Sequence, residues 1–66
     1  MNVNVLRKFK NPNGASQIHF KRFGEYYLAS DNGREVVIFK SNNKGEIVDF
    51  SGIYDFWTFD VIDHLF

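Results

Sequence analysis

The sequence predicts one α+β domain over residues 1–66, with an antiparallel sheet of four or five strands in a meander and a short C-terminal helix. Asn, Asp and Gly residues that favour turns recur about every ten residues, a spacing typical of antiparallel strands joined by hairpins. The segments between these turns are rich in β-branched and aromatic side chains. Apolar residues near the C-terminus instead share one arc of a helical wheel. These three patterns together indicate a sheet that is followed by a helix.

The first two strands are predicted at about 2–9 and 16–23. Apolar and polar side chains alternate in both segments, although the alternation in the first segment becomes less regular at Leu6. After the second strand, Gly24 and Glu25 form either a two-residue turn with Gly first or a bulge inside one longer strand. The sequence leaves both alternatives open.

The clearest hairpin joins residues 25–30 to residues 34–40. Asp31–Gly33 lies between them and predicts a tight turn, because an Asn-Gly pair supplies the positive φ angles of a reversed turn. The second of these strands contains four consecutive apolar residues, which favours a central strand covered on both faces. A turn rich in Asn and Gly then predicts a further strand over residues 46–50.

A short helix is predicted from about 59 to 65. Thr58 is a candidate N-cap, and Asp60 in the first turn and His64 in the last turn complement the helix dipole. Asp60, Asp63 and His64 share one side of the helical wheel. The opposite side is a broad apolar arc that is expected to face the sheet: Trp57, Phe59, Val61, Ile62, Leu65 and Phe66.

The absence of cysteine excludes several classes of site. A chain without cysteine has no disulfide, no thiol chemistry and no Cys-ligated zinc or iron–sulfur cluster. No apolar run reaches the roughly 18 residues that a membrane span requires, and no signal peptide is apparent. We therefore expect a cytoplasmic protein without a membrane partner.

Catalysis, cofactor binding and metal binding are all disfavoured by the residue pattern. The two histidines lie far apart in the sequence, the glycines are isolated, and no serine lies in a nucleophile elbow. A metal site would need Asp60 and His64, and two such residues on one helix face are better explained as a solvated face. We expect no enzyme activity, no cofactor and no metal.

The net charge of zero conceals a gradient along the chain. Residues 1–23 carry five basic side chains and no acidic one, whereas residues 45–66 carry five acidic side chains and no Lys or Arg. Either the two ends pair across the fold, or the basic end meets a polyanion, or the acidic end meets a basic protein.

Single-stranded nucleic acid is the alternative partner. It would contact a set of basic residues on the first two strands: Arg7, Lys8, Lys10, Lys21 and Arg22. Aromatic rings in the same strands offer stacking platforms of the kind that small β-barrels use. Against this hypothesis, Lys21 and Arg22 are neighbours and should point to opposite faces of a strand, and the rings are also needed for the core.

The second half of the sequence resembles small phage-encoded proteins of unassigned function. In residues 37–51, a strand, an Asn/Gly turn and a second strand with Asp49-Phe50 near its end precede Ile53 and a terminal helix that contains Asp and His. The resemblance covers less than half of the chain, and no binding residue is carried over from it. It implies a mobile-element origin, in which small domains often bind and inhibit a host protein, including proteins of host defence.

The favoured hypothesis is therefore a small protein-binding module that inhibits or modulates a host protein, with a homodimer as a further expectation. Residues 54–60 concentrate aromatic side chains next to acidic ones, as in interfaces where aromatic anchors lie inside a polar rim. Trp57 also has an alternative role as a core residue beneath the helix. The predicted partner-binding residues are Tyr54, Asp55, Trp57, Asp60 and Asp63.

Overall fold

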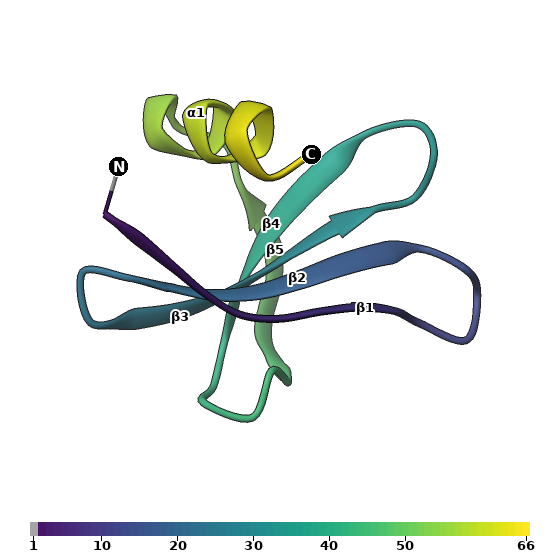
Figure 1. Ribbon diagram of the computed structural model, residues 1–66, viewed down its shortest axis with the longest axis horizontal. Coiled ribbons are helices and arrows are strands. Elements are labelled where there is room, and N and C mark those ends of the chain that lie inside the picture. Colours follow the sequence, from purple (N-terminus) through teal and green to yellow (C-terminus); the bar gives the residue numbers. More distant parts are fainter. Residues whose placement is uncertain (1) are drawn as a thin grey trace.

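The computed structural model describes residues 2–66 and contains five strands and one helix. The elements in chain order are β1 (Val3–Lys10), β2 (Ser16–Arg22), β3 (Glu25–Asp31), β4 (Val36–Ser41), β5 (Ile47–Ile53) and α1 (Phe56–Leu65). The strands form one antiparallel sheet in the order β1-β2-β3-β4-β5, and α1 covers one face of it (Figure 1). The predicted α+β class, the antiparallel meander and the C-terminal helix are confirmed.

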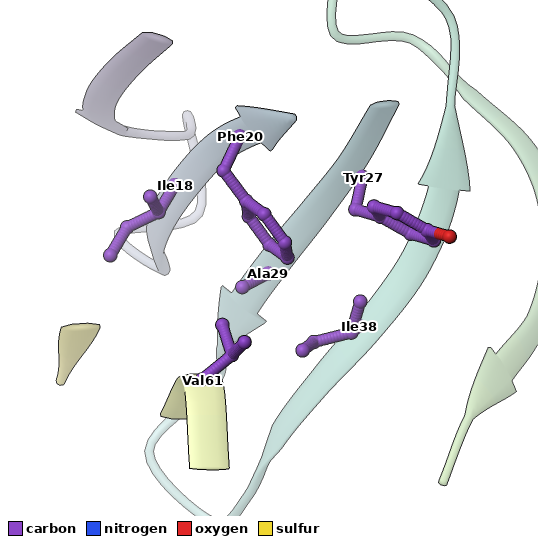
Figure 2. Packing of buried hydrophobic residues seen from close by; sticks show 6 residues of the cluster. All are labelled: Ile18, Phe20, Tyr27, Ala29, Ile38 and Val61. Carbon is purple, nitrogen blue, oxygen red and sulfur yellow. The ribbon is translucent and has the colours of Figure 1, made fainter. Parts of the chain in front are cut away.

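The core lies between α1 and the middle of the sheet. Register pairs Ile18 with Ala29 and Phe20 with Tyr27, so these four side chains share the face that α1 covers. Figure 2 shows how residues from β2, β3, β4 and α1 meet there. The cluster consists of Ile18, Phe20, Tyr27, Ala29, Ile38 and Val61. Alternation along the strands and one apolar arc of α1 are therefore enough to build this core.

The second face of the sheet carries a smaller buried group. His19 and Leu28 are register partners on this face, and both are buried. The loop between β4 and β5 lies against them, because the carbonyl oxygen of Asn42 is 3.1 Å from His19 Nε2 and Gly45 lies beside the imidazole ring. Because side chains are buried on both faces of the sheet here, β2 and β3 are the strands with consecutive buried residues.

The strand over residues 36–41 is an inner strand of the sheet, as the sequence predicted, but it is not fully covered on both faces. Ile38 is buried against α1, whereas Val37 and Phe39 on the other face are only half-buried. The one described helix, α1, packs on the Ile38 face and leaves the other face without a helix. Beside this strand, β5 also has extra residues between the pairs Ile38–Ile53 and Lys40–Asp49. That part of the prediction was wrong.

A bulge at Leu6 explains the irregular alternation in the first strand. Val5 pairs with Phe20 and Arg7 pairs with His19, so Leu6 is an extra residue in β1. A bulge of this kind reverses the alternation after it.

The connection between β2 and β3 is a two-residue turn formed by Phe23 and Gly24. Arg22 pairs with Glu25, and both central residues have positive φ, at 48° and 80°. This is the backbone of a type I′ turn, with Gly second rather than first. A two-residue turn is therefore present and a bulge is not, but its central residues are Phe23 and Gly24 rather than the predicted Gly24 and Glu25.

The β3–β4 hairpin is confirmed, but its turn differs from the prediction. Asp31 pairs with Val36, so the loop has four residues, 32–35, and only Gly33 has positive φ. The Asn32 side chain accepts hydrogen bonds from the backbone amides of Arg34 and Glu35 and so holds the loop. The side chain of Asn32 therefore shapes the turn, rather than a positive φ at that residue.

The helix begins three residues earlier than predicted. Asp55 is the N-cap, and Thr58 lies inside the first turn with its side chain buried. Asp60 is consequently not a first-turn residue, although His64 does lie in the last turn. Phe59 also faces solvent instead of the sheet, which corrects the predicted apolar arc.

Within residues 2–66, α1 is too short to span a lipid bilayer, and no other helix is described.

Candidate functional site

The outer side of α1 presents a continuous stripe of aromatic and acidic side chains. Phe59 and Asp60 follow Phe56 by three and four residues, and Asp63 follows them by four and three, which places these pairs on the same side of a helix. All four are exposed, and Tyr54 is exposed immediately before the helix. These five residues are called the aromatic–acidic surface below.

Three large rings of this surface face solvent. Phe56 is 92% exposed, Tyr54 is 63% exposed and Phe59 is 58% exposed. Thr58 and Val61 are the buried residues of α1, whereas Phe56 and Phe59 lie on its outer side. Leaving aromatic rings in water costs hydrophobic free energy, on the order of 2 kcal/mol for each ring. Large exposed apolar patches are typical of interaction surfaces, so these rings are the candidate site.

A cavity of about 260 Å³ adjoins two of these rings, those of Tyr54 and Phe59. It lies between α1 and the start of β4, where side chains of Val36, Ile53 and Ile62 form an apolar floor beside Tyr54 and Phe59. Glu35 and Thr58 complete the lining. The surface therefore combines projecting rings with a recess that can accept an apolar side chain of a partner.

Two of the residues predicted to bind a partner also have contacts within the protein. The Asp55 carboxylate accepts the Phe56 amide at 2.8 Å and serves as the helix cap. Trp57 is half-buried and packs edge-on against the Tyr27 ring, with 4.9 Å between ring centroids. The Arg22 guanidinium lies 4.2 Å from the centre of the Trp57 ring. Asp55 and Trp57 thus both have a structural role, and Trp57 packs against the core as its alternative role predicts.

Sequence reasoning named Tyr54, Asp60 and Asp63 but missed Phe56 and Phe59. The available signal was Asp55, because Asp is a favoured N-cap residue, and in the structure Thr58 completes a capping box with it. With the cap at Asp55, Thr58 falls in the centre of the buried arc and Phe59 falls outside it.

The structure divides the basic residues of the nucleic-acid alternative between two faces of the sheet. Arg7 pairs with His19 and Lys21 pairs with Tyr26, which places both on the face away from α1. Lys8 pairs with Ile18 on the face that carries α1, and Lys10 and Arg22 share that face.

The rings on the face away from α1 are engaged within the protein. The Arg7 guanidinium lies 4.8 Å from the centre of the Phe9 ring, and the Lys21 ammonium lies 5.2 Å from that of Tyr26. Tyr26 is also stacked on the His19 ring, at 5.8 Å between centroids. These contacts stabilise the sheet and leave only part of each ring for a ligand.

Tyr27 and Asp49 have shifted pKa values. Burial raises the pKa of Tyr27 to about 12, and its hydrogen bond to the Glu25 carboxylate, 2.8 Å from the hydroxyl, acts in the same direction. Hydrogen bonds from Ser51 hold the pKa of Asp49 below its usual range, with a further contribution from Lys40. Neither shift produces a catalytic acid or base near neutral pH.

Within residues 2–66, no three His, Asp or Glu side chains are grouped so that they could hold a metal ion. Comparison with protein-family models, with curated proteins and with solved structures finds no match to this chain.

Proposed function

We propose that this chain is a protein-binding module, and that the aromatic–acidic surface docks onto a basic, partly apolar surface of its partner. The observation that carries the proposal is the exposure of three rings, Tyr54, Phe56 and Phe59, of which Tyr54 and Phe59 line an apolar recess. Binding would remove these rings from water, and burial of aromatic side chains is a main source of affinity in protein interfaces.

Asp60 and Asp63 determine which partner chemistry fits. Both carboxylates lie next to the rings on the outer side of α1 and are exposed. Charged groups at the rim of an interface contribute mainly to the rate of association and to the choice of partner. A partner with Lys or Arg around an apolar groove would satisfy both parts of the surface.

An inhibitor or modulator of a host protein, acting in the host cytoplasm, is the proposed biological role. The support for this role is the sequence resemblance of residues 37–66 to small phage-encoded proteins and the lack of cysteine. A domain of this size acts most simply by covering a functional surface of its target, which requires an exposed apolar patch of the kind seen here.

The test is affinity capture from a nuclease-treated host-cell lysate with the immobilised full chain. The surface variant is Phe56→Ser with Phe59→Ser. The matched control is Phe23→Ser with Phe50→Ser, because these rings are also largely exposed, at 68% and 76%, but lie elsewhere. We expect a protein that the wild type and the control retain and the surface variant loses.

Two results would contradict the proposal. One is equal capture by the surface variant. The other is capture that occurs only from lysate without nuclease treatment and that is lost with Arg7→Ala and Lys21→Ala. This result would indicate a single-stranded nucleic acid bound to the opposite face.

A further inference from the structure

A second hollow lies at the other end of α1. Its volume is about 430 Å³, and the side chains of Ile18, Leu65 and Phe66 give it an apolar floor. Lys8 and Lys10 line it from the edge strand β1. Phe9, Ser16 and Gln17 complete the lining. This hollow, called the lysine groove below, combines apolar contact with positive charge.

We propose that the lysine groove of one copy of this chain receives the aromatic–acidic surface of a second copy. The two surfaces are complementary in both respects: exposed rings face an apolar floor, and Asp60 and Asp63 face Lys8 and Lys10. The inference rests on the proposed function of the aromatic–acidic surface. It adds the lysine groove as a second binding surface and a second copy of the chain as one partner.

The charges favour a second copy as the occupant. The chain as a whole has a net charge of zero, yet its basic residues are concentrated in the first strands and its acidic residues near the C-terminus. Two copies arranged head to tail bring opposite charges together, whereas a contact between like surfaces would oppose equal charges.

The two surfaces cannot meet within one chain. Phe56 is the first residue of α1 and Leu65 is its last, and the ten residues between these ends form a rigid helix. A ten-residue helix is about 15 Å long, and Phe56 points away from the sheet. The contact is therefore between copies.

This contact has a regulatory consequence. The rings that would bind another protein are covered when they lie in the groove of a second copy. Self-association and partner binding then compete, and dilution releases the binding-competent form by mass action.

The proposal is tested by sedimentation equilibrium of the full chain over concentrations that reach the millimolar range. One variant carries Lys8→Glu and Lys10→Glu, and the other carries Asp60→Lys and Asp63→Lys. The control carries Arg34→Glu and Lys44→Glu, two exposed residues in loops outside both surfaces. Circular dichroism establishes that each variant is folded.

We expect the wild type and the control to associate, and each surface variant alone to associate at least about tenfold more weakly. An equimolar mixture of the two surface variants should associate again, because each reversed surface then meets an opposite charge. A merely structural effect of the substitutions would not be reversed by mixing.

A wild type that stays monomeric at all concentrations would overturn the inference, and so would a mixture that fails to associate. Self-association lost with the Asp variant but kept with the Lys variant would also overturn it. In each of these cases the capture experiment still tests the proposed function separately. It measures whether the variant with Phe56→Ser and Phe59→Ser fails to retain a protein other than this chain.

Discussion

Asp55 and Thr58 close the first turn of α1 on each other. The Asp55 amide is 2.9 Å from Thr58 Oγ1, and the Thr58 hydroxyl donates to the Asp55 carbonyl oxygen at 2.6 Å. Because this capping box fixes where the helix begins, it also fixes which side chains face the sheet. Thr58 points inward, and the Phe56 and Phe59 rings point outward.

Asp55→Ala should lower the free energy of unfolding by about 1 kcal/mol, as expected for the loss of an N-cap. Urea denaturation measures this value. The control is Asp63→Ala, which removes an exposed carboxylate of the same helix and should change stability by less than about 0.5 kcal/mol. Equal effects of the two substitutions would argue against the cap.

Phe23→Asn should raise the free energy of unfolding by about 1 kcal/mol. Phe23 has a φ of 48°, in the left-handed region that an aromatic residue adopts at a cost of roughly 1–2 kcal/mol, and Asn tolerates this region better. The change also removes a ring that is largely exposed, so little buried contact is lost. Thermal unfolding gives the comparison, and a lower melting temperature for the variant would contradict the assigned turn.

Gly52→Ala should destabilise the protein more than Gly14→Ala. Both glycines have positive φ, at 74° and 84°, so Ala is strained at either position. A Cβ at Gly52 would also lie 3.1 Å from Val37 Cγ1 and 3.2 Å from the Tyr54 ring, whereas a Cβ at Gly14 meets nothing within 4 Å.

Denaturant titration measures the free energy of unfolding of both variants. The difference between the two values gives the cost of placing a Cβ where β5 closely approaches β4. Because Tyr54 is one of the neighbours, Gly52→Ala should also displace a ring of the aromatic–acidic surface. A loss of stability no greater than that of Gly14→Ala would show that the neighbours move aside without cost.

The raised pKa of Tyr27 makes stability depend on alkaline pH. The hydroxyl is neutral when protonated, and the native state holds this proton more tightly than the unfolded state does, with a pKa of about 12 against 10.0. Its contribution is fully present below pH 10 and is lost as the pH rises towards 12, by an amount on the order of 2 kcal/mol.

Tyr27→Phe removes the titrating group and keeps the ring in the core. Between pH 9 and pH 12 the free energy of unfolding should therefore fall more steeply for the wild type than for this variant. Parallel curves for the two proteins would show that other Tyr and Lys residues account for the whole pH dependence.

The sequence predicted the sheet because its turns carry a strong local signal. Asn, Asp and Gly mark the loops, and alternation in segments such as residues 16–23 gives the buried face. The bulges at Leu6 and near Gly52 were not predictable in the same way, because they depend on how two strands align rather than on the residues of one strand. Positive φ at Phe23 likewise depends on the length of the turn, which the sequence left open.

The candidate site could be predicted only in part. Tyr54, Asp60 and Asp63 were found from the mixture of aromatic and acidic residues in one segment. Phe59 was predicted to face the sheet because it shares a broad arc of the helical wheel with apolar residues such as Trp57 and Ile62. Thr58 is buried, so the inner side of α1 includes a polar residue and excludes Phe59, which the apolar pattern alone does not indicate.

Chemical-shift mapping by NMR tests the protein-binding claim most directly. Isotope-labelled wild-type chain is titrated with the protein that affinity capture identifies, and separately with a single-stranded oligonucleotide. With the protein, we expect the largest shifts at Tyr54, Phe56, Phe59, Asp60 and Asp63, and none of comparable size from the oligonucleotide. Shifts concentrated at Arg7, Phe9, Lys21 and Tyr26, produced by the oligonucleotide and reduced by added salt, would contradict the account.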